Sequence, residues 1–437
     1  MSESPSAAPD AGAPPSSLRI NISLGAMMFL QYMLVAVWFV QLSAYTKKAG
    51  IDGTLATLIL SSMAVGSMAS PVVCGLAGRY LASEKVLAIA NMATGVFLLG
   101  AALTGHNAVL TLVFTLLAML FYMPTWALTS SIAMSHGDPK NFPRIRTLGT
   151  VGWVASGLFS IAAAHFFGVK VFDGTSLPFF CGAGIAIVAA LQNLTLPSTP
   201  PSNDGSAFSI SKALGLNAFG LLKDRDYLVF IAGSFAAMVA FVLYFSYAAQ
   251  FLYTKGFGNI TSTLNWGQAG EMVFMFLTTT VLKKIGVKKA LLIGLLAMAA
   301  RYFLFYLGDV HNAEPLYIAG ILMHGLIFGW FFAGGQVYTD EKAPKELRAQ
   351  AQGMFAFLIW GVGVLAGTFA HGMLIDKFTV AREIADPGSP AGVSVRHLTD
   401  WAPIFMGTSI FSLVIFAFFL VFFDNGKKAG GGDAIQA

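Results

Sequence analysis

Charged residues are sparse along this chain and separate long apolar runs. Residues 20–46 and 53–78 contain no Asp, Glu, Lys or Arg, and the uncharged run 86–137 is long enough for two helices. A helix needs about 20 apolar residues to cross the hydrocarbon layer of a membrane. The pattern therefore predicts twelve spans, at 20–46, 53–78, 85–104, 108–134, 143–167, 176–196, 226–254, 262–283, 287–307, 314–339, 347–375 and 400–423.

A polar segment interrupts this pattern after the sixth predicted span. It begins Pro-Ser-Thr-Pro-Pro-Ser-Asn-Asp-Gly and leaves six spans on each side. Both chain ends lack apolar runs and read as disordered tails, and the first one lacks the basic start of a signal peptide. We therefore expect a tail at 1–18, a six-helix bundle at 19–196, a linker at 197–225, a second six-helix bundle at 226–424 and a tail at 425–437.

The composition agrees with a polytopic membrane protein. Hydrophobic residues make up 56% of the chain and charged residues only 11%, with a mean hydropathy of +0.71. A soluble domain carries about 25% charged residues. The two cysteines, Cys74 and Cys181, lie in apolar stretches and exclude a disulfide-rich secreted scaffold.

The distribution of basic residues predicts the orientation in the membrane. Of the 26 Lys and Arg residues, 18 fall on the side of the N-terminus and 7 on the other side, while Arg301 lies within a span. Basic residues concentrate in cytoplasmic loops. We therefore expect both termini and the linker in the cytoplasm. The basic charge is spread over loops that flank the membrane, which argues against nucleic acid as a partner.

Enzyme chemistry finds little support in the sequence. It contains no Cys/His cluster with metal-ligand spacing, no phosphate-binding Gly-rich loop and no Gly-x-Ser-x-Gly turn. We expect no enzyme activity, no cofactor and no metal. A solute receptor is a further alternative, but the short tails and linker leave little room for a signalling domain.

One acidic residue lies well inside a predicted span. Glu271 is in the helix 262–283, and Gln268, three residues earlier, lies on the same helix face. An ionisable residue within a membrane is costly and indicates a functional site by default. We interpret the pair as facing a polar cavity. A structural hydrogen bond to a neighbouring helix is the alternative.

A second polar face opens the fifth predicted span. Arg146, Thr150 and Trp153 follow one another at intervals of four and three residues, so they share one helix face. A guanidinium, a hydroxyl and an indole suit a polar solute that contains a ring. The alternative is an interfacial arginine that reaches back to the cytoplasm, with the tryptophan in the core.

Histidines and one further arginine lie within or near spans. His324 is followed by Phe328 one helical turn later and has several glycines nearby, so a ring-binding face is one interpretation and a satisfied core histidine the other. For His165 and His371 the structural interpretation is favoured. It is also favoured for Arg301, because the ninth span is usually peripheral in twelve-helix transporters.

Twelve spans split six and six match the plan of the major facilitator superfamily, in which the substrate lies near the midplane between two bundles. Other twelve-helix transporter folds share this pattern. More specifically, the chain resembles the nucleoside:proton symporter family of this superfamily, the NupG-type bacterial nucleoside permeases. The resemblance extends from the first span to the last. It is carried by Phe29-Leu-Gln-Tyr, Tyr122-Met-Pro-Thr, Phe142-Pro-Arg-Ile-Arg-x-x-Gly-Thr-x-Gly, Leu214-Gly-Leu-Asn-Ala-Phe, Gln268-x-x-Glu271 and Arg348-Ala-Gln-Ala-Gln-Gly-Met-Phe.

The resemblance implies an all-α membrane protein with the major facilitator fold and a central cavity that binds a nucleoside by its base and ribose. It implies substrate-binding roles for Arg146, Thr150, Trp153, Gln268, Glu271, His324 and Phe328. Trp153 stands where the family usually has phenylalanine, and His324 where it has tyrosine. Val242 and Phe245 stand where the family has a polar amide pair, and Gly329 replaces an acidic residue.

These inferences predict a nucleoside transporter of the bacterial inner membrane that works as a monomer in the lipid bilayer. The expected mechanism is alternating access driven by a proton gradient, with Glu271 as the proton carrier. Burial favours the protonated form of a carboxyl group and a nearby arginine favours the ionised form, so movement of Arg146 or the substrate could change the protonation of Glu271. The alternative is an uncoupled facilitator, or a symporter for a sugar or a modified nucleoside.

Overall fold

The computed structural model describes residues 18–105, 107–136, 142–201, 209–385 and 393–424. Its first ten helices form what we call the N-terminal half. They are α1 (Leu18–Phe39), α2 (Leu42–Lys48), α3 (Gly53–Leu60), α4 (Ser62–Tyr80), α5 (Ser83–Ala102), α6 (Ala108–Tyr122), α7 (Pro124–His136), α8 (Phe142–Ala155), α9 (Leu158–Phe167) and α10 (Leu177–Asn193).

The predicted linker contains two short helices, α11 (Ile210–Ala213) and η1 (Leu216–Lys223). The C-terminal half follows. It consists of α12 (Arg225–Thr254), α13 (Ile260–Ile285), α14 (Val287–His311), α15 (Glu314–Leu322), α16 (His324–Leu326), η2 (Ile327–Ala333), α17 (Gly334–Lys342), η3 (Lys345–Leu347), α18 (Arg348–Phe355), η4 (Ala356–Gly363), α19 (Val364–Lys377), strands β1 (Thr379–Ala385) and β2 (Val393–Thr399), and α20 (Trp401–Phe422).

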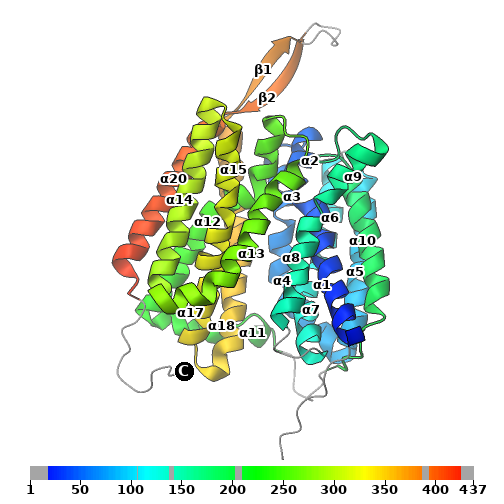
Figure 1. The fold of residues 1–437 in the computed structure, drawn as a ribbon, viewed down its shortest axis with the longest axis vertical. Coiled ribbons are helices and arrows are strands. Elements are labelled where there is room, and N and C mark those ends of the chain that lie inside the picture. Colours follow the sequence, from blue (N-terminus) through cyan, green and yellow to red (C-terminus); the bar gives the residue numbers. More distant parts are fainter. Residues whose placement is uncertain (1–17, 106, 137–141, 202–208, 386–392, 425–437) are drawn as a thin grey trace, which may run out of the picture.

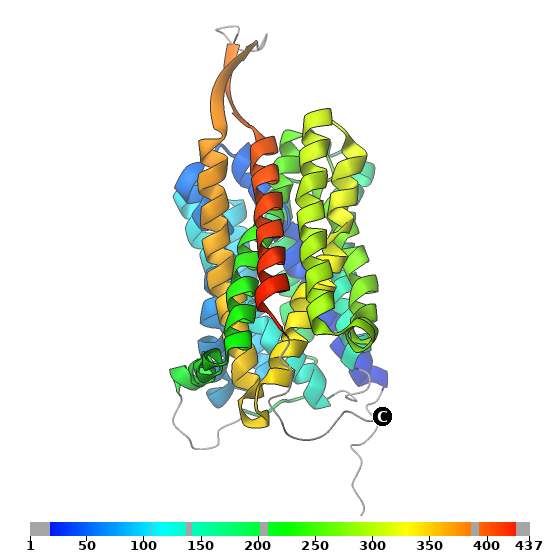
Figure 2. The same ribbon diagram turned by 90° about the vertical axis from the view of Figure 1, so that its left-hand side faces the viewer.

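The two halves stand side by side with their long helices roughly parallel (Figure 1). Strands β1 and β2 pair antiparallel, with Thr379 opposite Thr399, and project beyond the helices (Figure 2). We call this the hairpin end and the opposite one, where α11 lies, the linker end. The hairpin is an element that the apolar pattern does not predict, because it lies outside the spans. The predicted boundaries of the two bundles stay a prediction.

The helical membrane protein expected from the sequence is confirmed. Within the described residues, nine helical segments are long and apolar enough to cross a membrane, and the bent pair Arg144–Ala155 and Leu158–Phe167 makes a tenth. Two predicted spans fall outside this number. The helix α10 is apolar but has only 17 residues, and α13 has 26 residues with polar side chains at its centre.

Several spans are interrupted rather than straight. Helices α8 and α9 meet at an angle of 41°, beside Gly157. Segments η2 and η4 are π-helical turns inside the spans Glu314–Lys342 and Gln350–Lys377. Such turns shift the side chains that follow them to a different face of the helix and occur often at functional sites. The interruptions therefore direct attention to the centre of the molecule.

Hydrogen bonds between the two halves gather toward the hairpin end. The Ser262 hydroxyl donates to the carbonyl oxygen of Gly157 at 2.7 Å, and the Asn265 amide donates to that of Val154 at 3.0 Å. A Cβ on Gly157 would lie 2.8 Å from the Asn265 amide nitrogen, so a larger residue here would displace the Asn265 side chain. The two halves are therefore closed against each other at this end.

Asp173 strengthens this closure from the loop between α9 and α10. Its side chain is 1% exposed and accepts from the Thr261 backbone N–H at 3.0 Å and from the Thr261 hydroxyl at 2.7 Å. Burial raises the pKa of Asp173, and the bonds from Thr261 offset part of this effect. Because the carboxyl is hydrated when the halves part, protonation favours closure, and this contribution is lost as the pH rises through the raised pKa.

We expect Asp173→Ala to open the hairpin end. The change removes both acceptors and leaves the Thr261 N–H without a partner, at a cost of about 1–3 kcal/mol. A cysteine at Val40, which lines the small central space, in a background with Cys74→Ala and Cys181→Ala, should then react about tenfold faster with a water-soluble maleimide. The labelling rate of purified protein measures this.

Two controls distinguish the loss of the bonds from Thr261 to Asp173 from a general disturbance of the loop. Asp173→Asn keeps one acceptor oxygen and should change the rate much less. Thr175→Ala removes a hydroxyl that donates to Phe172 within the same loop, and it should leave the rate unchanged. Equal labelling of Asp173→Ala and wild type would show that Asp173 does not hold the halves together.

Candidate functional site

Three predicted site residues meet in the C-terminal half. Gln268 and Glu271 lie on one face of α13, and His324 begins α16. The His324 Nε2 atom lies 2.9 Å from the Gln268 Nε2 atom and 3.3 Å from a Glu271 carboxylate oxygen. Glu271 is only 8% exposed. Gln268 and Glu271 thus share a partner on a neighbouring helix, which is the contact that the alternative interpretation of this pair supposed.

Glycines on both helices allow this approach. A Cβ on Gly325 would lie 2.5 Å from the carbonyl carbon of Gly270, and a Cβ on Gly267 would lie 3.0 Å from the Cβ of His324. Either contact is closer than real Cβ atoms tolerate without movement of a neighbour. Small residues let two helices in a membrane touch along their backbones. Here they bring the polar side chains of α13 within hydrogen-bond distance of His324.

The His324 ring can satisfy both protonation states of Glu271. If Nε2 carries the hydrogen, it donates to the ionised Glu271 carboxylate. If Nε2 carries the lone pair, it accepts either from the Gln268 amide or from a protonated Glu271. The histidine tautomer and the amide orientation that fit this geometry therefore depend on whether Glu271 acts as an acceptor or as a donor. Within the described residues, the buried Nδ1 atom has no hydrogen-bond partner.

Aromatic rings enclose His324. The ring centroids of Phe241, Tyr244 and Phe328 lie 5.7, 5.3 and 5.8 Å from that of His324. Phe328, a predicted substrate contact, is thus a neighbour of His324.

Arg301 completes this group from α14. Its side chain is fully buried, and its guanidinium carbon lies 4.0 Å from the centroid of the Tyr244 ring. Its Nε atom donates to the Gly320 carbonyl oxygen at 3.3 Å. These contacts connect α14 to neighbouring helices, as the structural interpretation of Arg301 supposes, and they also hold the ring that lies against His324.

Arg146, the predicted site residue at the start of the N-terminal half's α8, faces α1. Its guanidinium carbon lies 4.2 Å from the centroid of the Tyr32 ring, which stacks on Trp126 at 5.5 Å. A cation over an aromatic face is held by the ring's negative π cloud. Tyr32 and Trp126 therefore form a cluster with Arg146. The sequence alone does not predict a role for either ring, although the family motif Phe29-Leu-Gln-Tyr ends on Tyr32.

A buried polar network supports this cluster. Gln31 exchanges hydrogen bonds with Asn91, and its amide also donates to the Thr125 hydroxyl at 2.5 Å. Trp126 Nε1 donates to the Tyr122 hydroxyl at 2.8 Å. Satisfied networks of this kind hold side chains in one geometry. The hydrogen bond from Trp126 to Tyr122 thus holds the ring on which Tyr32 stacks beside Arg146.

The central space between the halves is small in this arrangement. Trp153 of α8 lines it together with Gln268 and His324, so three predicted residues from both halves share one cavity. Its volume is about 40 Å³, which holds a few water molecules. Sites for small organic ligands are usually about 300–1,000 Å³. The space that these residues line in this arrangement is therefore smaller than such sites.

The other four predicted residues lie outside this lining. Glu271 and Phe328 are held behind His324, and Arg146 lies over Tyr32. Thr150 is half-buried on α8, one helical turn beyond Arg146.

The other two histidines that lie within or near predicted spans are His165 and His371. His371 is buried with Nδ1 3.0 Å from the Gly367 carbonyl oxygen, and His165 is exposed. Val242 is buried, and Phe245 lines the central space.

Comparisons with known proteins agree with this architecture. A family model described as Nucleoside H+ symporter matches residues 18–428. The chain is 31% identical over 419 residues to the putative nucleoside transporter YegT of Escherichia coli (strain K12), covering 94% of this chain and 95% of that protein. It is 24% identical over 437 residues to the nucleoside permease NupG of the same strain, covering 93% and 96%.

Solved structures show the same fold. The crystal structure of the nucleoside transporter NupG superposes with a TM-score of 0.78 at 22% identity, covering 93% of this chain and 99% of that chain. The crystal structure of a D-xylose-proton symporter gives a TM-score of 0.70 at 13% identity, covering 94% and 99%. The major facilitator fold expected from the sequence is therefore confirmed.

We expect Gly325→Ala to disturb the contact between α13 and α16. The added methyl group meets the Gly270 backbone and the Phe274 ring, and overpacking of this kind costs about 1–3 kcal/mol. The melting temperature of the purified protein should fall. Gly184→Ala on α10 is the matched control, since a Cβ there meets nothing within 4 Å. Equal melting temperatures for Gly325→Ala and wild type would contradict the close approach.

Proposed function

The chain belongs to the Nucleoside H+ symporter family, and from this premise we propose how its residues couple a nucleoside to a proton. Glu271 carries the proton. Gln268, His324 and Phe328 contact the nucleoside from the C-terminal half, and Arg146, Thr150 and Trp153 contact it from the N-terminal half. The observation that carries the proposal is the contact of His324 with both Gln268 and Glu271.

The Gln268 amide links the proton to the solute. When Glu271 is protonated, His324 accepts from the Gln268 NH2 group, and the amide oxygen faces the central space. When Glu271 is ionised, His324 donates to it, and the amide is free to turn its NH2 group toward that space. Protonation thus changes whether the cavity offers the solute an acceptor or a donor. Ribose hydroxyls and base N–H groups favour the acceptor, so the protonated site binds a nucleoside more tightly.

Alternating access follows from the two halves. The described arrangement is closed at the hairpin end, and its central space is too small for a nucleoside. Solute binding therefore requires the halves to separate around the centre. A ligand shifts such an equilibrium only by its different affinity for the two arrangements. The orientation of the Gln268 amide supplies one such difference.

The protein is a multi-pass membrane transporter, and we propose that it lies in the bacterial inner membrane, which its similarity to Escherichia coli transporters supports. We propose that both termini and the linker end face the cytoplasm, as the basic residues indicate, and that the hairpin end faces outward. It works as a monomer within the lipid bilayer, without nucleic acid as a partner. An uncoupled facilitator or a carrier of another polar solute was the alternative from sequence, and the family does not favour it.

Glu271→Gln tests the proton role. The amide preserves the shape of the carboxyl group but cannot bind and release a proton, so accumulation driven by a pH gradient should disappear. Exchange of labelled for unlabelled nucleoside should persist. Uptake of uridine and adenosine into proteoliposomes, with and without an imposed pH gradient, measures both. Glu314→Gln, an exposed acid at the start of α15, is the matched control and should behave as wild type.

Two outcomes would count against this assignment in different ways. Gradient-insensitive uptake by the wild type would contradict symport but leave nucleoside transport intact. A Glu271→Gln protein that still concentrates nucleoside would remove Glu271 from the coupling role.

His324→Phe tests the amide link separately. The ring is retained but its nitrogens are lost, so protonation of Glu271 no longer reorients Gln268. Wild-type affinity for uridine should increase from neutral to acidic pH, whereas the affinity of the variant should stay constant. Isothermal titration of purified protein gives both values. His165→Phe, on the exposed surface of α9, is the control. A variant that retains the full pH dependence would refute the link through His324.

A further inference from the structure

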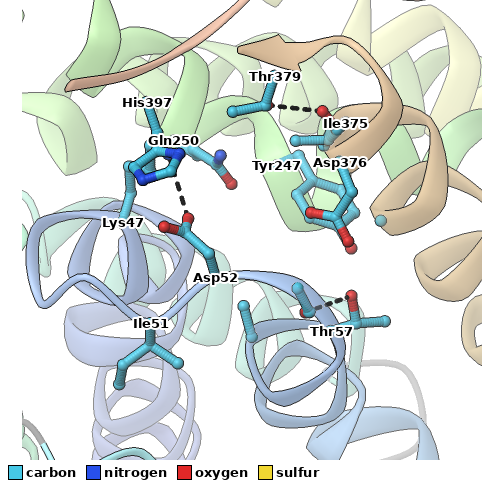
Figure 3. Close-up of a pocket in the computed structure, with 13 residues that line it drawn as sticks. Lys47, Ile51, Asp52, Thr57, Tyr247, Gln250, Ile375, Asp376, Thr379 and His397 are labelled. Atoms are coloured by element: carbon cyan, nitrogen blue, oxygen red, sulfur yellow. Dashed lines mark hydrogen bonds and ion pairs between the residues drawn. The ribbon is translucent and has the colours of Figure 1, made fainter. Parts of the chain in front are cut away.

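A second and larger cavity opens at the hairpin end, away from the residues described above (Figure 3). Its volume is about 370 Å³, within the range of sites for small organic ligands. The central space, lined in part by Phe39 and Phe245, is much smaller. The tip of α2, the start of α3 and parts of α12, α19, β1 and β2 form its walls. Both halves of the protein therefore contribute to it.

The floor of this outer pocket is a tight contact between the halves. Thr57 of α3 approaches Gly372 of α19 and the hydroxyl of Tyr247, and a Cβ on Gly372 would lie 3.0 Å from that hydroxyl. The Tyr247 hydroxyl donates to the Thr368 carbonyl oxygen at 2.8 Å. The pocket is thus a closed-bottomed chamber in this arrangement and not the mouth of an open channel to the centre.

Carboxylates dominate the chemistry of the walls. Asp52 comes from the N-terminal half and Asp376 from the C-terminal half. Lys47 Nζ lies 3.1 Å from one Asp52 oxygen, and the Asp52 side chain remains 46% exposed. Asp376 is also exposed. Two carboxylates face one ammonium group and the His397 imidazole. With a neutral imidazole the balance is negative, which favours hydrogen-bond donors and repels anions.

The remaining lining suits a ring. Ile51, Ala56 and Ile375 provide apolar surface, and the Gln250 amide adds a further polar group. A nucleoside offers ribose hydroxyl and base amino donors together with a flat ring, and it lacks the phosphate of a nucleotide. Its size and chemistry therefore match this chamber.

We propose that the outer pocket is a second nucleoside-binding site, in which Asp52 and Asp376 accept hydrogen bonds from the solute and exclude nucleotides. This inference rests on the proposed function for the identity of the solute. Because both halves form the walls, the site exists only while the hairpin end is closed. A bound solute stabilises the arrangement that it binds. Occupation from outside therefore delays reopening and makes uptake decline at high external nucleoside concentration.

The test is the initial rate of uridine uptake by proteoliposomes over a wide range of external concentrations. The wild type should show a maximum followed by a decline. The double variant Asp52→Asn with Asp376→Asn loses the charge-assisted acceptors, so the decline should move to a roughly tenfold to hundredfold higher concentration. Uridine monophosphate should not compete at this site in the wild type.

A second variant and a control keep the result decisive. Ala56→Leu narrows the pocket with a larger apolar side chain and leaves both carboxylates in place, so it should also move the decline to a higher concentration. Asp400→Asn, at the same end but outside the lining, should leave the decline unchanged. Thermal unfolding of each protein verifies folding. A decline that persists unchanged in both pocket variants, or a wild type that saturates without decline, would overturn the outer site. No uridine uptake by the wild type would instead contradict the proposed function.

Discussion

A carboxyl group buried within a membrane must find its hydrogen-bond partners inside the protein, and Glu271 imposes this requirement on the helices around it. Its partner His324 reaches it only because α13 and α16 touch at Gly270 and Gly325. The span that carries His324 is interrupted on both sides, by the end of α15 at Leu322 and by the π-helical turn η2. Glycines and helix breaks thus bring a histidine within hydrogen-bond distance of a buried carboxyl group.

The two halves divide the work at the centre. The C-terminal half holds the titratable pair, whereas the N-terminal half presents a fixed cation over the Tyr32 ring. The network behind Tyr32, built on Gln31 and Asn91, is buried and hydrogen-bonded. In the mechanism that we propose, the rigid surface holds the solute and the contacts of His324 change when the solute is released. The link between them is the central space, which Trp153 and Gln268 line from opposite sides.

Much of this could be predicted from the sequence, and the gaps have physical causes. Uncharged runs locate the spans, and the spacing of Gln268 and Glu271 correctly places both side chains on one face of α13. The pairing with His324 could not be predicted, since it depends on a helix break and on contact between two glycines far apart in the chain. Tyr32 was overlooked because a tyrosine in an apolar helix is unremarkable until its neighbour Arg146 is placed above it. The hairpin β1–β2 lies outside the spans, where the apolar pattern carries no information.

The closure of the hairpin end limits how tightly the protein can bind its solute. The halves are joined there by hydrogen bonds such as Ser262 to Gly157 and Thr261 to Asp173. Each bond of this kind contributes about 1 kcal/mol net, more where a carboxylate is involved. A small set of such bonds holds the closed arrangement without making it permanent, because solute binding can supply a comparable free energy when the halves rearrange. Much stronger closure would trap the transporter, and much weaker closure would let the solute and the proton move independently. A small number of hydrogen bonds between the halves at the hairpin end therefore suits the coupled movement of solute and proton.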